Sequence, residues 1–359
     1  MKKIILLLGI ILIFLLLSGI SFGEGIQNTR TVTDSLGRDI IIPQEVNSVI
    51  CSGAGGLRYL TYLNMQDQII GIDSIDAGDP AGRPYAIAHP EFQDLPVIGD
   101  FKGSGHGSDN LEEIISLKPD LIIKTYESLE NINKEEERLG IPVLYLEYGD
   151  LGVNREQMYK SLRILGDAMG AHDRAEEVIN FFNDQISDLN KRTSNISENN
   201  KPSAYVGGVG YYGAMGIEST EPAYPPFNLT HVRNVASGTG IEHAQVSREQ
   251  IVEWDPNYFF LDLGCKDISD LSNTTIFPVL SAVKDGRVYG LLPYNSYTTD
   301  QDTVLADAYY IGTILYPDRF SDIDPEIKAD EIYTYLVGKP VFDTLNARYN
   351  KMAFIPLKF

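Results

Sequence analysis

Tyrosines stand at many of the positions where this chain of 359 residues is expected to meet a ligand. The sequence holds 21 tyrosines, and several flank short apolar segments that read as strands. A phenol can stack on a ligand, donate a hydrogen bond or bind Fe(III) as a phenolate. Packing at a loop edge is the alternative for any one of them, but the group indicates that a few face a shared cleft. These tyrosines are Tyr85, Tyr126, Tyr148, Tyr211, Tyr212, Tyr224, Tyr294 and Tyr297.

Three segments rich in glycine or tyrosine are expected to line this cleft. They are "SGAGGLR" (52–58), "GYYGAMGIES" (210–219) and "PYNSY" (293–297). Open α/β sheets bind ligands in the loops at the carboxyl ends of their strands, and arginines there would face an anionic ligand. Together with all of the tyrosines above except Tyr148, the predicted ligand site contains Ser52, Gly53, Arg58, Arg83, Glu218 and Asn295.

Signatures of enzymes are absent from the sequence. "GVGYYG" (208–213) satisfies G-x-G-x-x-G, but a dinucleotide site also needs a helix that opens at the last glycine. A proline-rich stretch without helical period follows instead. There is no G-x-S-x-G, H-E-x-x-H or Walker pattern. The five histidines are scattered. His106, in the glycine-rich "KGSGHGS", is the histidine among them with the best position for a functional role. The sequence thus predicts no catalytic residue, no metal ligand and no cofactor.

One helix–proline–strand unit occurs twice in the chain. "NLEEIISLKPDLII" (110–123) aligns without gaps to "SREQIVEWDPNYFF" (247–260), so that Glu112 falls on Glu249. In each copy a proline ends a short helix and an apolar run follows, which is typical of a buried strand. The two acids also suit the first turn of a capped helix. The repeat favours two similar lobes.

The order of elements around this repeat predicts an α/β fold. A hairpin over 31–43 precedes strands that alternate with helices, which is typical of a parallel sheet. A helical stretch over 155–191 is broken once at "GDAMG", and strand–helix alternation then restarts. We expect an N-terminal α/β lobe (30–154), a helical segment that includes the interlobe helix (155–194) and a C-terminal α/β lobe (200–350).

The N-terminal segment and the net charge of the chain indicate where the protein is located and which partners it can have. Residues 1–23 have the order of a secretory signal peptide, with an uncleaved membrane anchor as the alternative. We therefore expect an exported protein on the extracytoplasmic face of the membrane. The formal charge of −21 argues against nucleic acid as a partner. Cys51 and Cys265 are expected to remain thiols, because a bridge would restrain two lobes that must open.

Six segments in order give the chain a family resemblance over about 31–337. It resembles the substrate-binding proteins of ABC importers for iron complexes, haem and cobalamin, the class III periplasmic binding proteins. The segments are "TVTDSLGRDIIIP", "NLEEIISLKPDLII", "IPVLYLE", "VSREQIVEWDPNYFFLD", "AVKDGRVYGL" and "ADAYYIGTILYPDRF".

The resemblance implies two Rossmann-like lobes with parallel sheets, joined by a single long helix at about 171–193, with the ligand between them. It implies a monomer that delivers an iron chelate or related metal complex to a permease and its ATPase subunits, with Glu112 and Glu249 docking on the permease. The segment 210–236 departs from the family's usual second-lobe loop. An oxyanion such as molybdate and, in another class, an exported metal-processing enzyme therefore stay open as alternatives.

Overall fold

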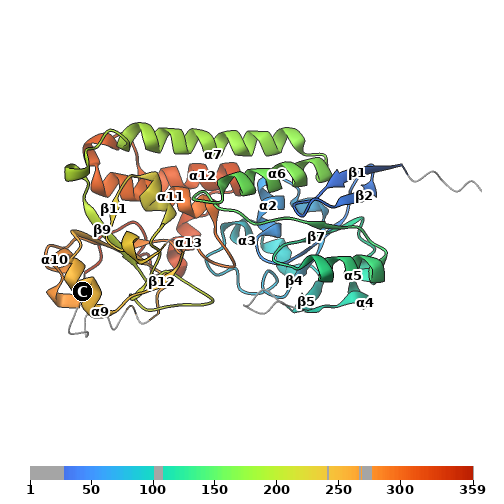
Figure 1. The fold of residues 1–359 in the computed structure, drawn as a ribbon, viewed down its shortest axis with the longest axis horizontal. Helices are drawn as coiled ribbons and strands as arrows, with labels where there is room; N and C mark the ends of the chain where they lie inside the picture. The colour runs from blue at the N-terminus through green and yellow to red at the C-terminus, as the bar shows by residue number, and fades with distance from the viewer. Residues whose placement is uncertain (1–27, 101–107, 241, 267, 269–276, 359) are drawn as a thin grey trace, which may run out of the picture.

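The computed structural model describes residues 28–100, 108–240, 242–266, 268 and 277–358, and two main sheets arise from separate parts of this chain (Figure 1). The first has six strands in the order β6-β5-β4-β3-β7-β8, and only β6 is antiparallel to its neighbour. Its strands are β3 (Val49–Ser52), β4 (Ile69–Asp73), β5 (Val97–Asp100), β6 (Ser108–Asp109), β7 (Leu121–Lys124) and β8 (Val143–Tyr145). We call this part the N-terminal lobe.

Helices and a hairpin complete the N-terminal lobe. The predicted hairpin is confirmed, because β1 (Thr29–Thr33) pairs antiparallel with β2 (Asp39–Pro43). The helix expected near Gly56 begins there and forms α2 (Gly56–Tyr62). The other helices of the lobe are α3 (Pro84–Ala88), α4 (Leu111–Leu117) and α5 (Leu129–Leu139).

The second sheet defines the C-terminal lobe. Its four strands lie in the order β11-β9-β13-β14 and are all parallel. They are β9 (Ser203–Gly207), β11 (Arg233–Asn234), β13 (Tyr258–Asp262) and β14 (Val288–Leu291). A small hairpin of β10 (Ser219–Thr220) and β12 (Ala244–Gln245) stands apart from this sheet. The short helices of the lobe are α8 (Pro225–Leu229), α9 (Arg248–Trp254) and α10 (Ser281–Lys284).

Long helices connect the two lobes. The predicted break in the helical stretch is present, because Gly170 ends α6 (Arg155–Met169) with a φ of 69° before α7 (His172–Thr193) begins. Figure 1 shows α7 running along both lobes. After β14 the chain forms α11 (Gln301–Leu315), α12 (Pro325–Val337) and α13 (Phe342–Arg348). Since α12 packs against α2 and α3, these last helices also tie the C-terminal lobe to the N-terminal lobe.

The repeated unit folds in the same way in both lobes. The Asn110 side chain caps α4 by accepting from the Glu113 N–H, and Ser247 caps α9 by accepting from the Gln250 N–H. At the strand that follows, the Asp120 N–H donates to the Ser48 hydroxyl at 3.1 Å. The Asn257 N–H donates to the Ser203 hydroxyl, also at 3.1 Å. Each hydroxyl stands at the start of the neighbouring parallel strand, so the matched Asp and Asn fix the pairing of the two strands in each lobe.

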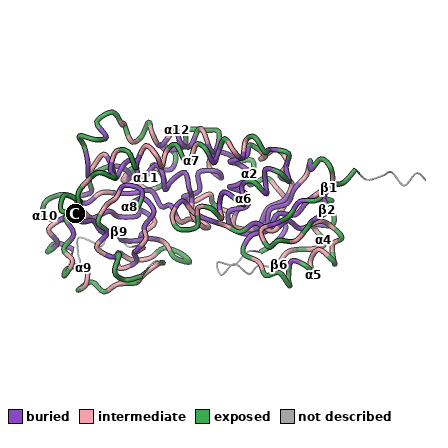
Figure 2. Tube along the Cα trace, turned by 45° about the horizontal axis from the view of Figure 1, so that its top comes forward, coloured by how far each residue is buried: buried purple, intermediate pink, exposed green. Residues whose placement is uncertain are grey.

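Buried residues fill both lobes and continue along α11, whereas exposed residues follow the outer surface (Figure 2). Cys51 and Cys265 lie in this interior as separate, buried thiols, as expected. The segment 1–23 and His106 lie outside the described residues. Within the described residues, no helix has the length and apolar character that a membrane crossing requires.

Candidate functional site

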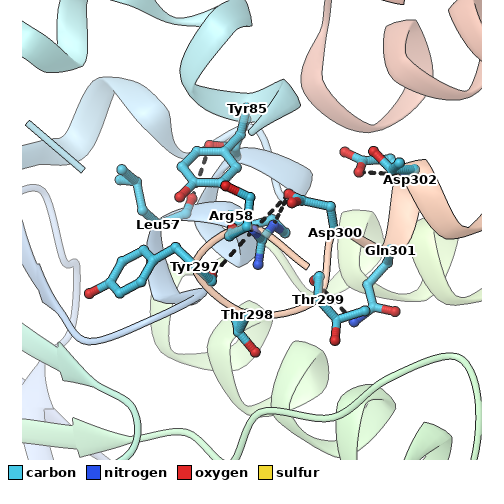
Figure 3. Close-up of polar contacts among 12 residues, drawn as sticks. Leu57, Arg58, Tyr85, Tyr297, Thr298, Thr299, Asp300, Gln301 and Asp302 are labelled. Carbon is cyan, nitrogen blue, oxygen red and sulfur yellow. Dashed lines mark hydrogen bonds and ion pairs between the residues drawn. The ribbon is translucent and has the colours of Figure 1, made fainter. Parts of the chain in front are cut away.

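The segment between β14 and α11 crosses from the C-terminal lobe to the N-terminal lobe. We call residues 294–300 the interlobe strap. Tyr297 and Thr298 in its middle have φ values of 56° and 66°, a left-handed conformation that costs energy in residues other than glycine. Such strain persists where the surroundings fix the backbone, and here the strap is held by hydrogen bonds to the opposite lobe. Figure 3 shows Arg58 of that lobe reaching the strap at Asp300.

Arg58 of α2 makes the most buried of these interlobe contacts. Its Nε donates to Oδ1 of Asp300 at 2.7 Å, and both side chains are fully buried. Its other nitrogens donate to the Tyr148 hydroxyl at 2.7 Å and to the Ser296 carbonyl at 3.2 Å. Burial by itself lowers the pKa of Arg58, but Asp300 raises it above its ordinary value. Arg58 was predicted to face an anionic ligand. In the structure it instead forms an ion pair that joins the two lobes.

A second interlobe contact runs through buried acids of the N-terminal lobe. The Tyr297 hydroxyl donates to Oδ2 of Asp73 at 2.5 Å, and the Gly53 N–H donates to the same oxygen. Nearby, the Tyr85 hydroxyl donates to Asp76 at 2.5 Å. Burial, with Asp73 close by, raises the pKa of Asp76 to about 7. The predicted ligand residues Gly53, Tyr85 and Tyr297 therefore serve this network.

Two further cations at the carboxyl edge of the first sheet are also engaged. The Lys124 ammonium group bridges Asp109, at 2.7 Å, and Glu135, and the Ser52 hydroxyl donates to the same Asp109 at 3.0 Å. Arg83 is buried, and one of its terminal nitrogens donates to two backbone carbonyls at 2.7 and 2.9 Å. Ser52 and Arg83, both predicted to lie in the ligand site, thus form hydrogen bonds within the protein.

Three of the predicted tyrosines remain exposed. The exposed fractions are 43% for Tyr126, 45% for Tyr211 and 77% for Tyr212. Tyr126 belongs to the N-terminal lobe, where its hydroxyl lies 2.8 Å from the Thr298 hydroxyl of the interlobe strap, and Tyr212 belongs to the C-terminal lobe. Both have left-handed backbones, with φ values of 53° and 51°. Tyr211 stacks on His243 with ring centroids 4.0 Å apart and packs against Tyr212, and its loop is tied to the interlobe strap because the Gly210 carbonyl accepts from Asn295.

The other predicted residues of the C-terminal lobe lie beneath this aromatic group. Tyr224 and Tyr294 are buried and pack edge to face, with centroids 5.4 Å apart. The Asn295 side chain donates to the Gly210 carbonyl at 2.8 Å and so supports the tyrosine-bearing loop. Glu218 is ion-paired with Arg248.

Sequence reasoning missed four acidic or basic residues at this junction. Asp73 and Lys124 end apolar strands, so the rule that selected the tyrosines also applied to them. Asp300 and Glu221 carried no such signal. Within the described chain, no three His, Cys, Asp or Glu side chains converge as the ligands of a metal ion.

Comparison with known proteins agrees with this architecture. Residues 49–294 match a family model described as "Periplasmic binding protein". The molybdate-binding protein MolA of Haemophilus influenzae is 24% identical over 90% of this chain and 94% of its own length. Its molybdate-bound structure superposes with a TM-score of 0.69 at 20% identity, covering 86% of this chain and 98% of that one. The iron(3+)-hydroxamate-binding protein FhuD of Bacillus subtilis is 25% identical over 56% of this chain and 66% of its own length.

Proposed function

Because the chain belongs to the periplasmic binding protein family, we propose that it captures an iron chelate or related metal complex between its lobes. It acts as the substrate-binding protein of an ABC transporter outside the cytoplasmic membrane, and its partners are the permease and its ATPase subunits. In this proposal the protein binds and releases its ligand without changing it chemically, so it is not an enzyme.

The observation that supports a metal complex best is the exposed aromatic group. Tyr126, Tyr211 and Tyr212 present phenols from both lobes at their junction. Phenol faces stack on the organic part of a chelate, and their hydroxyls bond its polar atoms. FhuD, an iron(3+)-hydroxamate-binding protein by name, is among the relatives.

The likeness to MolA supports an oxyanion as the second candidate. A small dianion in a cleft needs several donors with uncompensated positive charge. Here Arg58 is paired with Asp300, and Lys124 with Asp109 and Glu135. The pairing of these two cations favours a metal complex over molybdate, while Arg83 contacts backbone carbonyls and forms no ion pair in the described chain.

A ligand panel tests this proposal. We expect saturable binding of ferric hydroxamate complexes, haem or a corrinoid by isothermal titration calorimetry, and no heat of binding from molybdate. Tyr212→Ala should weaken binding of the accepted complex about tenfold, since an aromatic contact contributes about 0.5–1.5 kcal/mol beyond its buried area. Binding of molybdate alone would refute the metal-complex proposal.

Two exposed acids suit docking of the protein on its permease. Glu112 in α4 and Glu249 in α9 are exposed and hold equivalent places in the two lobes. Figure 1 shows both helices on the side of the molecule opposite α7. A permease built of two like halves would offer two like basic sites. Such rim charges act mainly on encounter rate and orientation.

Charge reversal at both positions tests the docking surface. Glu112→Arg with Glu249→Arg should lower ligand-driven transport in reconstituted vesicles by about tenfold or more at low salt, with unchanged ligand affinity. The control pair Glu177→Arg with Asp184→Arg, which makes the same change of charge on α7, should transport normally. Equal transport by both double variants would contradict the docking role. Glu112 and Glu249 would then act only as acids that stabilise the first turns of their helices.

A further inference from the structure

One carboxyl group at the lobe junction has no ion-pair partner in the described chain. Glu221 follows β10 and precedes the turn into α8. Its backbone carbonyl is engaged, because it accepts from the Asn234 side chain at 2.9 Å and from the Tyr224 N–H at 3.2 Å. The groups that act on its carboxyl are the acids Asp150 and Asp262, and together with burial they raise its pKa to about 8.

The surroundings place Glu221 between the two lobes. Asp150 belongs to the turn that ends the N-terminal lobe, where it accepts from the Gly152 N–H at 2.7 Å. That turn meets the start of α8, since a Cβ at Gly152 would lie 3.7 Å from Cγ of Pro225. Asp150 also acts on the exposed Tyr126. Acids of the two lobes therefore lie near each other here, Asp150 from the N-terminal lobe and Glu221 from the C-terminal lobe.

Two buried polar atoms near Glu221 lack hydrogen-bond partners in the part of the chain that the structure describes. They are the Tyr224 hydroxyl and Oδ2 of Asp262, and both side chains are at most 1% exposed. Tyr224 interacts electrostatically with Glu221 and Asp262. Buried polar atoms are normally satisfied, so these two atoms leave hydrogen-bonding capacity for a polar group of a bound ligand.

We infer that the ligand carries a positive charge at its surface and that Glu221 selects this charge. The inference rests on the proposed function and adds the charge class of the ligand to it. Arg58 and Lys124 are neutralised by acids of the protein, whereas Glu221, on which Asp150 and Asp262 act, has no ion-pair partner among the described residues. A cationic group of a chelate would pair with Glu221, while the faces of Tyr126 and Tyr212 attract cations as well.

A pair of probes that differ in one charge tests the inference. The first is a linear tris-hydroxamate iron(III) complex with a terminal ammonium group, and the second is the same complex with that amine acetylated. We expect the protein to bind the ammonium form about tenfold or more tightly. Glu221→Gln should abolish this preference while it retains binding of the acetylated form. Glu137→Gln, which removes one exposed charge from α5, should keep the preference.

Proton release provides an independent measurement. At pH 7 a carboxyl with a pKa of about 8 is about 0.9 protonated. Pairing with a cation favours its ionised form, so binding of the ammonium probe should release up to about 0.9 proton. Calorimetry in two buffers of different ionisation enthalpy counts this release, which should vanish in Glu221→Gln and for the acetylated probe.

The outcomes separate this inference from the proposed function. Equal affinity for the two probes, in the parent and in Glu221→Gln, would overturn the cationic ligand and leave the metal complex standing. Binding of molybdate with no binding of either probe would overturn both. If Glu221→Gln still binds the ammonium probe more tightly than the acetylated probe, Glu221 is not the residue that selects the charge.

Discussion

Replacing Arg58 by methionine is expected to lower the free energy of unfolding by about 3–5 kcal/mol at pH 8. The guanidinium joins α2 to Asp300 at the start of α11, and both side chains are fully buried. Methionine fills similar space with a flexible apolar chain, so the loss measures mainly the unpaired Asp300 carboxylate. Urea unfolding followed by circular dichroism gives the value.

A double-mutant cycle separates the ion pair from packing. Because burial raises the pKa of Asp300 and Arg58 opposes that effect, Arg58→Met should cost less at pH 5, where Asp300 can take a proton. Arg58→Met with Asp300→Asn should recover a large part of the loss, since replacing both members of a buried pair is often close to neutral. The exposed pair of Arg163 and Glu176, at 2.6 Å, supplies the control: Arg163→Met should cost at most about 1 kcal/mol. Equal losses at the two arginines would show that Arg58 contributes no more than a surface contact.

The same arginine shows where reading the sequence succeeds and where it stops. The apolar periods and the proline–strand junctions are local signals, and they located the hairpin, the longer strands of both sheets, the break at Gly170 and both copies of the repeat. The two-residue strands β6, β10, β11 and β12 carry no such signal. The direction in which Arg58 points depends on Asp300, which lies 242 positions away in the sequence. No local pattern encodes that pairing, so the sequence suggested an anion contact where the structure has an interlobe ion pair.

The tyrosines divide for the same reason. Their positions at strand ends were readable, but exposure depends on which segments of the other lobe cover them. Tyr224 and Tyr294 are buried against each other and their neighbours, whereas Tyr126, Tyr211 and Tyr212 stay exposed. Glu221 had no readable signal, because its unusual feature is the absence of a cation among residues brought together by folding.

Stability should rise as the pH falls from about 8.5 to about 5. Burial raises the pKa of Asp262 to about 8 and that of Asp76, close to Asp73, to about 7, whereas unfolded aspartates titrate near 4. The folded state therefore holds protons that the unfolded state has lost, so the free energy of unfolding decreases with increasing pH in this window. Each such group contributes up to about 1.4 kcal/mol per pH unit between its two pKa values. Thermal unfolding midpoints measured at constant ionic strength will show the slope.

Asp262→Asn assigns part of this slope to a single side chain. Asp262 ends β13, is 1% exposed and accepts from the Gly264 N–H at 2.8 Å, while its other oxygen has no partner. The amide keeps the shape of the protonated acid and cannot ionise, so the variant should gain stability relative to the parent as the pH rises from 5 to 8.5. Asp184→Asn, at an exposed position of α7, should run parallel to the parent. If the Asp262→Asn profile is also parallel to the parent, the Asp262 carboxyl is already ionised in the folded protein, and a bound cation then becomes the physical explanation for its burial.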